Sequence, residues 1–496
     1  MSIRGGPAAA RRWAARVRST VGVRASSTSG QSRVLQAPRF NFKDIRARPE
    51  VYIDSIRERR MAPRIREYVP KILELYERRI EIEKRKNTEF LDRKDLHQAM
   101  DALRKSTADK QAVAGQRAEL AGALSAVKKR LQTLEDDLRA VEVELEDLVE
   151  DVPNILSPTA PRNDEPRPIR ILNPPTAETS SERPPAVRPG QKSHLEIGLE
   201  RGLVDVETAS RISGSKCYYL LNEAVQLELA LVQYGLAVAA RHGYRMMMPP
   251  SIVRTEIVRA CGFRPRDGDS ERQIYDVTAD VDEGLSLAAT AEIPMAGWGA
   301  NKVFREQDAP IKWVGVSRSY RAEAGSRGSG AKGLYRVHEF TKVEMFAFAW
   351  PGAGEGAPDA LSAGLHEEMR EIQEEIIGGL GLCARVMEMP ASDLGASAYK
   401  KYDIEAWMPG RTVGDVGGSW GEVTSTSNCL DFQARRMNTR VRAADGASLE
   451  FAHTLNGTAM AVPRVIAALL ENGYDEATGR VAVPAVLQPY MGCASF

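Results

Sequence analysis

The feature that most restricts the fold is a run of apolar residues in the first third of the chain. They recur at alternating spacings of four and three: Leu120, Leu124, Val127, Leu131, Leu134, Leu138, Val141, Leu145 and Leu148. This is the heptad pattern of a helix whose apolar seam packs against a partner helix. Because the other positions are polar and charged, the pattern predicts a coiled coil.

A second helical segment, at about 65–103, precedes the heptad run and has a looser apolar pattern. The sequence KSTADK at 105–110 predicts the tip between the two helices. Two helices of about 35–40 residues would form an antiparallel hairpin about 50–60 Å long. A dimerisation zipper is the alternative, but a partner helix in the same chain already covers the seam.

Cations gather toward the outer half of this predicted hairpin, although acidic residues are interspersed. A stiff basic rod is suited to lie along the phosphate backbone of a nucleic acid. The candidate contacts are Arg78, Arg79, Lys84, Arg85 and Lys86.

Composition excludes several classes of protein. A net charge of +1 argues against a protein that is basic throughout, though not against a local basic patch. The five cysteines include no C-x-x-C pair, which argues against zinc or a disulfide framework and favours a reducing compartment. The chain has no apolar run long enough to cross a membrane, so no membrane span is expected.

The first 43 residues differ from the rest of the chain. They are rich in Arg, Ser and Ala, and no acidic residue occurs before Asp44. This composition is typical of a mitochondrial transit peptide, so we expect the protein in the mitochondrial matrix. A disordered basic tail is the alternative.

A proline-rich stretch separates the hairpin from the remainder, with nine of the 27 prolines between Pro158 and Pro189. This predicts an extended connector at 153–192 rather than helix or sheet. The expected divisions are therefore a targeting segment at 1–43, an arm at 44–152, the connector, and a mixed domain at 193–496. Strand-like runs that can pair in sequence predict an α+β domain with a largely antiparallel sheet.

Within this domain, residues 318–346 place two polar strand-like runs around a glycine-rich loop. Strand parity puts Arg321 and Glu323 on one face. In the second run, one face carries Arg336, His338, Phe340, Lys342 and Glu344. Cations, carboxylates and an aromatic ring suit ATP and an amino acid, whereas an exposed sheet face is the alternative. No G-x-x-x-x-G-K-[ST] loop is present, so another device must hold the nucleotide.

Four segments, in order behind a two-helix arm, carry a family resemblance: VHEFTKVEMF (337–346), KKYDIEAWMPG (400–410), EVTSTSNCLDFQARR (422–436) and HTLNGTAMAVPRVIAALLEN (453–472). Over nearly all of 60–492 the chain resembles class II aminoacyl-tRNA synthetases, most of all the seryl-tRNA synthetase family in its mitochondrial type. The resemblance implies an antiparallel sheet flanked by helices. It also implies a homodimer formed through a first motif that ends at MMMPPSIV, with Pro250 at the proline position of the class.

The resemblance also implies a reaction and its residues. ATP and L-serine would form an adenylate, with serine tRNA as the acceptor and no membrane involved. The catalytic residues would be Arg321, Glu344 and Arg464. Serine would be bound by Thr290, Ala291, Glu292, Arg321, Glu344 and Thr458. ATP would be bound by Arg321, Ala322, Glu323, Val337, His338, Glu339, Phe340, Glu422, Val423, Thr424, Ser425 and Arg464, with Mg²⁺ on Glu422 and Ser425. The five arm cations would contact the tRNA.

Some positions depart from the family pattern, and two alternatives stay open. The loop GSRGSGAKG lacks the acidic and threonine residues often found there, and TVGDVGGSW at 412–420 resembles an insertion. A catalytically silent paralogue would keep the fold as a binding module, which the intact charged positions oppose. An amino acid:carrier-protein ligase would share the fold without the arm, which the heptad run opposes.

The N-terminal composition generates a first prediction. Residues 1–43 fused to a fluorescent reporter should direct it into mitochondria, and removing them should leave the activity of the purified enzyme unchanged, because they precede every motif. Import of the fusion into cells is the measurement. A reporter that stays in the cytosol contradicts the transit-peptide interpretation.

Overall fold

The computed structural model describes residues 35, 39–105, 110–187, 190–263, 274–277, 284–323, 333–351, 359–412, 417–444, 446 and 448–496. Most of the predicted targeting segment, and residues 106–109 of the predicted tip, lie outside these residues. Leu35 is buried in an apolar cluster, and the Arg39 N–H donates to the carbonyl of Arg435 at 3.2 Å. The end of the segment predicted as transit peptide therefore takes part in the fold, and a deletion of all 43 residues would also remove these contacts.

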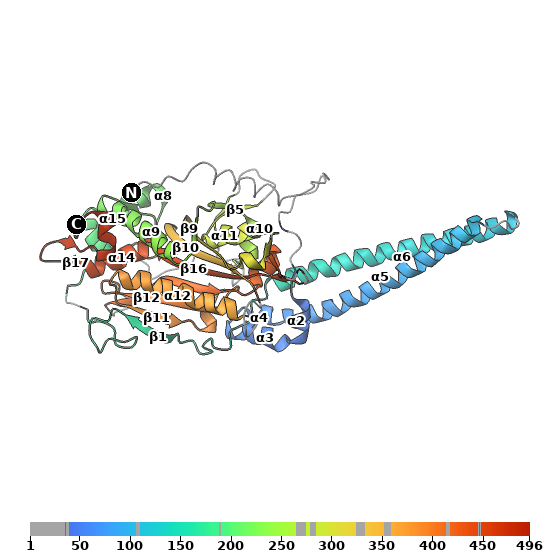
Figure 1. Ribbon diagram of the computed structural model, residues 1–496, viewed down its shortest axis with the longest axis horizontal. Coiled ribbons are helices and arrows are strands. Elements are labelled where there is room, and N and C mark those ends of the chain that lie inside the picture. Colours follow the sequence, from blue (N-terminus) through green and yellow to red (C-terminus); the bar gives the residue numbers. More distant parts are fainter. Residues whose placement is uncertain are drawn as a thin grey trace. The chain divides into compact units, whose positions relative to one another are not determined.

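The predicted arm is confirmed as two long helices, α5 (Tyr68–Lys105) and α6 (Lys110–Glu150), which run side by side (Figure 1). The heptad seam is buried at Val127, Leu131, Leu134, Val141 and Leu145, and it faces Val69, Ile72, Leu75 and Ile82 of α5. Near the base, Val149 rather than Leu148 is fully buried. The seam is thus covered within the chain.

Ion pairs join the two arm helices outside the seam. Lys86 Nζ lies 3.1 Å from Glu135, and Arg79 Nε lies 3.4 Å from Glu142. Two of the five cations predicted to bind nucleic acid are therefore engaged across the hairpin. The other three, Arg78, Lys84 and Arg85, are exposed.

Three short helices precede the arm: α2 (Phe42–Ala47), α3 (Pro49–Glu58) and α4 (Pro63–Arg66). Proline at the first position of α3 and of α4 suits a helix start, where its missing N–H is not needed. Ile45, Ile56 and Ile65 pack against the base of α5 and α6 in one apolar cluster.

The main sheet has eight strands in the order β1-β11-β12-β13-β16-β10-β9-β4. Its strands are β1 (Arg167–Leu172), β4 (Arg245–Met247), β9 (Ile311–Tyr320), β10 (Glu339–Ala349), β11 (Ala384–Glu388), β12 (Lys400–Met408), β13 (Ser419–Asn428) and β16 (His453–Ala461). All neighbours are antiparallel except β4 and β9. The predicted antiparallel α+β sheet is confirmed.

Three helices cover one face of this sheet: α9 (Glu223–Arg241), α12 (Ala360–Gly379) and α14 (Val462–Gly473) (Figure 1). On α9, Leu227, Leu231, Tyr234 and Val238 are buried, at the spacing of one helix face. Because this face of the sheet is filled with apolar side chains, polar ligands can be bound only from the opposite face.

The remaining elements are short. The helices are α7 (His194–Glu200), α8 (Glu207–Ser213), α10 (Thr255–Ala260), α11 (Glu292–Trp298), α13 (Phe432–Met437) and α15 (Gln488–Met491). The 3-10 turns are Glu306–Asp308, Ala391–Asp393 and Ala485–Leu487. The small strands are β2 (Val204–Asp205), β3 (Tyr219–Leu220), β5 (Ile252–Arg254), β6 (Asp276–Val277), β7 (Leu285–Leu287), β8 (Val303–Arg305), β14 (Arg440–Arg442), β15 (Leu449–Phe451), β17 (Tyr474–Asp475) and β18 (Arg480–Val481). Among the described residues, no helix is both long and apolar enough to cross a bilayer.

The proline-rich connector contains a strand that its composition did not predict. Residues 167–172 form β1 at the edge of the main sheet, paired with β11. The expectation of no sheet was therefore wrong for these six residues. Proline is tolerated on an edge strand, and the register shifts between Pro168 and Arg170.

The arm generates a second prediction. Leu145 is 1% exposed, so Leu145→Ala should leave a cavity in the seam and destabilise the hairpin by about 2–5 kcal/mol. Val143→Ala is the matched control on the same helix, since Val143 is 54% exposed. Hydrogen exchange of the α6 amides measures the difference in stability. Equal exchange in both variants would contradict the packing of Leu145 between α5 and α6.

Candidate active site

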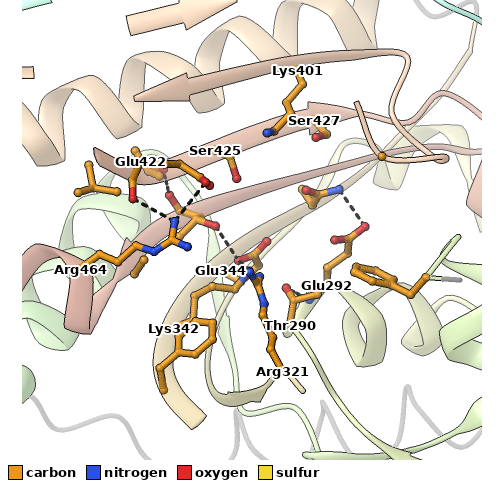
Figure 2. Close-up of a pocket in the computed structure, with 18 of the residues that line it drawn as sticks. Thr290, Glu292, Arg321, Lys342, Glu344, Lys401, Glu422, Ser425, Ser427 and Arg464 are labelled. Carbon is orange, nitrogen blue, oxygen red and sulfur yellow. Dashed lines mark hydrogen bonds and ion pairs between the residues drawn. The ribbon is translucent and has the colours of Figure 1, made fainter. Parts of the chain in front are cut away.

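A cavity of about 360 Å³ lies on the face of the main sheet opposite α9, α12 and α14. Its polar lining comes from the segment after β9, from β10, β12, β13 and β16, and from the first turns of α11 and α14. In the view of Figure 2, Arg464 and Glu422 lie at one end and Glu292 at the other, with Arg321 and Glu344 between them.

Most of the predicted ligand-binding residues line this cavity. They are Thr290, Glu292, Arg321, Glu323, Val337, Phe340, Glu344, Glu422, Val423, Thr424, Ser425, Thr458 and Arg464. Four are not part of the lining: Ala291, Ala322, His338 and Glu339. Ala291 is buried in the apolar cluster beside the cavity, and His338 lies with Nδ1 2.9 Å from the Tyr275 hydroxyl. Glu339 is exposed and pairs with Arg318 at 3.0 Å.

The strand-parity argument for Arg321 and Glu323 was wrong, although both side chains line the cavity. Strand β9 ends at Tyr320, so neither residue is in a strand. Glu323 has φ of +44°, a left-handed conformation that is unusual for a residue other than glycine. The two residues therefore reach the cavity from the segment after β9, and Glu323 does so with a left-handed backbone conformation.

The polar face of β10 is buried rather than solvated. Lys342 Nζ lies 2.5 Å from Glu344 Oε2, and their side chains are 6% and 2% exposed. An ion pair removed from water is stable only when its remaining polar atoms are also satisfied. Thr458 contributes here, since its Oγ1 donates to Glu344 Oε2 at 3.3 Å. The alternative of an exposed sheet face is excluded for these residues.

Two β-bulges border the cavity and decide which side chains face it. Glu405 pairs with Glu422 and Ile404 with Thr424, so Val423 is an extra residue on β13. An extra residue reverses the alternation of a strand, which brings Glu422 and Ser425 to the same side despite their odd spacing. On β16, Ala459 is the extra residue, and Thr458 therefore lies opposite Glu344.

Two guanidinium groups dominate the part of the cavity that extends from Arg464 at one end to Arg321 near the middle. Arg464 Nη1 lies 3.1 Å from Glu422 Oε2 and also donates to the Glu422 carbonyl at 3.0 Å. Arg321 lies over the Phe340 ring, 5.2 Å from its centroid. Burial favours a raised pKa for Glu422, but Arg464, Lys401 and Arg321 outweigh it and lower that pKa to about 2. Planar guanidinium forks suit paired oxyanions such as phosphates.

The other end of the cavity holds a carboxyl group in an apolar setting. Glu292 Oε1 accepts from Gln433 Nε2 at 2.7 Å and from Asn456 Nδ2 at 3.0 Å. Burial, and then the neighbouring Glu344, raise the pKa of Glu292 to about 7. A carboxyl group poised in this way can accept an ammonium group from a ligand, because the cation would lower its pKa.

The donor set at Glu422 and Ser425 fits a magnesium ion. Both offer oxygen, and Mg²⁺ usually takes one or two protein carboxylates while keeping waters and substrate phosphates. Within the part of the chain that the structure describes, no cluster of three His, Cys, Asp or Glu residues could hold a metal. A metal here would therefore depend on ligand oxygens as well as on this chain.

Several lining residues were not predicted. Lys401 and Ser427 line the cavity and lie beside each other in Figure 2, and Lys401 Nζ lies 2.9 Å from Asp403 Oδ2. Burial, partly opposed by Lys401, raises the pKa of Asp403 to about 7. Lys401 and Asp403 are two residues apart on a predicted strand, and this spacing is the sequence pattern that could have indicated them. Tyr335, which lies under Arg464 and Arg411, and the segment 395–398 gave no comparable pattern.

Comparison with known proteins decides the family. Residues 275–473 match the model of the tRNA synthetase class II core domain (G, H, P, S and T). The mitochondrial serine–tRNA ligase of Saccharomyces cerevisiae is 46% identical over 375 residues, covering 75% of this chain and 78% of that protein. The serine–tRNA ligase of Treponema denticola is 38% identical over 455 residues, covering 91% and 99%. This chain belongs to the seryl-tRNA synthetase family.

Solved structures agree with this family. The seryl-tRNA synthetase of Pyrococcus horikoshii, complexed with ATP, superposes with a TM-score of 0.80 at 31% identity, covering 92% of this chain and 99% of that one. The cytoplasmic enzyme of Naegleria fowleri, in complex with AMP, gives 0.71 at 27% identity, covering 91% and 96%. The predicted class II fold is confirmed over nearly the whole chain.

The buried carboxyl group generates a third prediction. Glu292 is protonated in the folded state up to about pH 7 but ionises near 4.5 when unfolded. Its contribution to stability is therefore complete below pH 4.5 and is lost as the pH rises through 7. Glu292→Gln should remove this part of the pH dependence, which unfolding midpoints of both proteins from pH 5 to about 8 measure. Parallel curves for the two proteins contradict the raised pKa.

Proposed function

We propose that this chain activates L-serine with ATP and transfers the seryl group to serine tRNA in mitochondria. The observation that carries the proposal is the presence, in one cavity, of two partly buried guanidinium groups and of a polar region built from Glu292, Glu344 and Thr458. The guanidinium groups suit the phosphates of ATP, and the polar region suits a small amino acid with a hydroxyl group.

The first step is an in-line displacement. An oxygen of the serine carboxylate bonds to the α-phosphorus of ATP, the bond to the bridging oxygen breaks, and pyrophosphate leaves. Arg321 contacts the carboxylate and the α-phosphate, and Arg464 the γ-phosphate. Such a reaction needs positioning and charge neutralisation more than an acid or a base. Glu422 and Ser425 would hold a Mg²⁺ ion, which would supply positive charge near the phosphates.

The base of ATP is bound beside the arginines. Phe340 offers a ring face for adenine, and Glu323 accepts from its amino group. Val337, Val423 and Thr424 line the cavity around these groups. Ala322, His338 and Glu339 stay predicted contacts of the base, through backbone groups, since their side chains lie outside the cavity.

Serine is bound at the opposite end. The ionised Glu292 pairs with its ammonium group, while Thr290, Glu344 and Thr458 surround its hydroxyl group. A site that bonds a hydroxyl discriminates strongly against alanine, because its polar groups are left unpaired without it. Ala291 lies behind these residues and shapes the site without contacting the ligand.

In the second step a terminal ribose hydroxyl of the tRNA attacks the serine carbonyl and AMP leaves. The arm supplies affinity for the tRNA through phosphates, which position an RNA without reading its bases. The presence of α5 and α6 distinguishes this chain from a carrier-protein ligase, which would lack the arm. The intact charged groups of the cavity distinguish it from a silent paralogue.

A homodimer and a mitochondrial location complete the proposal. Leu229 of α9, Met246 of β4 and the nearby Met248 are 56%, 60% and 80% exposed. Apolar side chains on an edge strand and its neighbouring helix favour an interface with a second copy. The basic N-terminal segment and the similarity to a mitochondrial relative support the location.

The deciding experiment is serine-dependent ATP–pyrophosphate exchange, followed by charging of total mitochondrial and cytosolic tRNA, with threonine, alanine and glycine as competitors. Serine should be activated and transferred, with the other three far less active. Exchange with none of these amino acids would contradict the proposed function.

The fourth prediction concerns Arg321. Arg321→Lys should reduce exchange by about 100-fold or more, because an ammonium keeps the charge but cannot bind two oxyanions in a fork. Arg321→Ala should abolish it, and both variants should keep the unfolding midpoint of the parent. Near-normal exchange by Arg321→Lys contradicts the assigned role.

The fifth prediction separates exposed from paired cations on the arm. Replacing Arg78, Lys84 and Arg85 with Gln should weaken tRNA binding and reduce its salt dependence by roughly one unit of slope for each lost phosphate contact. Replacing Arg79 and Lys86 should change the slope less, since both already pair with glutamates. Binding titrations at several salt concentrations test this, and an unchanged slope in the triple variant contradicts the arm's role.

A further inference from the structure

Six consecutive backbone carbonyls beside the cavity accept hydrogen bonds from the base of the arm and from the first residues of the connector that follows it. We call residues 394–399 the wall, and Ser55, Arg59, Asn154 and Ser157 the root cluster. Arg59 Nη1 donates to Leu394 at 3.3 Å and Gly395 at 2.6 Å, and Nη2 donates to Ala398 at 2.5 Å. The Asn154 backbone N–H donates to Ala396 at 2.8 Å and its Nδ2 to Ser397 at 2.9 Å, while the Ser157 N–H donates to Tyr399 at 3.0 Å.

The root cluster is itself buried and connected. Arg59 is 3% exposed and Asn154 is 8% exposed. Arg59 Nε donates to Ser55 Oγ at 3.0 Å, and both Ser55 and Arg59 donate to the Asn154 carbonyl. A buried network whose members are satisfied is rigid, because each bond is strong in a low dielectric and costly to break. The wall is therefore fixed to residues more than 200 positions away.

The wall lines the cavity at the end that holds Glu292. Gly395, Ala396, Ser397 and Ala398 are lining residues, as is Gly262, where an added side chain would meet Ser397. Asn154 Nδ2 also donates to the Cys429 carbonyl at 2.8 Å.

A second connection runs from Cys429 to the carboxyl group. Asn456 Nδ2 lies 3.7 Å from Cys429 Sγ and donates to Glu292 Oε1 at 3.0 Å. The root cluster therefore reaches Glu292 through Cys429 and Asn456. Different groups hold the two arginines that face the phosphates: Arg321 donates to the Ala289 carbonyl, and Arg464 donates to the carbonyls of Tyr335 and Glu422.

We propose that Arg59 and Asn154 are positioning residues for the amino-acid end of the cavity. They hold the wall in the place that serine requires, and this inference rests on the proposed serine activation. The arm then has two separable functions: its outer half binds tRNA, and its base shapes the amino-acid site. Loss of the root cluster should raise the KM for serine while leaving the KM for ATP unchanged.

The test compares Arg59→Lys and Asn154→Ala in the full-length enzyme by ATP–pyrophosphate exchange. Lysine keeps the charge but cannot reach carbonyls in the directions of the guanidinium fork. Each variant should raise the KM for serine by about five- to tenfold, with the KM for ATP and kcat changed less than about twofold. Arg57→Gln is the matched control, because Arg57 lies near Arg59 but is 57% exposed and pairs with Asp54. It should match the parent enzyme in every constant.

The outcomes separate this inference from the proposed function. If the parent enzyme shows no serine-dependent exchange, the proposed function fails. If the parent is active and both variants keep its serine KM, the inference is overturned. Equal changes in both KM values and kcat, together with a lower unfolding midpoint, also overturn it, since they indicate a general structural role. If Arg59→Lys does not fold, Asn154→Ala decides, because it leaves the Arg59 contacts to the wall in place.

Discussion

The antiparallel hydrogen-bond ladder that joins β9, β10, β16 and β13 is the constraint on which the rest of the structure depends. Strand β10 pairs with β9 on one side and β16 on the other, and β16 pairs with β13. Neighbouring strands lie about 4.8 Å apart, so this ladder brings together segments separated by more than a hundred residues. Arg321, Glu344, Glu422 and Thr458 come from four different segments of the chain and line one cavity for this reason.

A sheet that carries so many charges needs electrostatic compensation. At the phosphate end the cations prevail, and the pKa of Glu422 is lowered to about 2. At the opposite end burial prevails, and the pKa of Glu292 is raised to about 7. The cavity thus contains two carboxyl groups with opposite environments, which divides it into an end suited to anions and an end suited to a cation. This division matches the charges of ATP and of an amino acid.

The arm depends on a different physical principle. Its helices are stabilised by a local seam, and its cations are arranged partly for the hairpin itself, as the pairing of Arg79 and Lys86 with glutamates indicates. Its base belongs to another network, in which Arg59 and Asn154 bind backbone carbonyls of the catalytic domain. Where the expected arm and the catalytic domain meet, the contact is made of directional hydrogen bonds rather than of apolar surface alone.

The sequence by itself determined the arm, the antiparallel class of the sheet and most of the cavity residues. The heptad spacing is a local signal, and the motif residues stand at fixed places in short segments. Strand parity, in contrast, placed Arg321 and Glu323 together for the wrong reason, because β9 ends at Tyr320 and Glu323 has a left-handed backbone conformation. Composition likewise missed β1, because an edge strand can accept proline.

Only the tertiary structure decided which face each strand presents and what holds the wall. A bulge such as that at Val423 exists relative to a partner strand, so no periodicity within β13 reveals it. The pairing of Lys86 with Glu135 depends on the register of two helices. Arg59 and Asn154 bind the wall through its backbone carbonyls. Because every residue has a backbone carbonyl, the side chains of 394–399 could not predict these contacts.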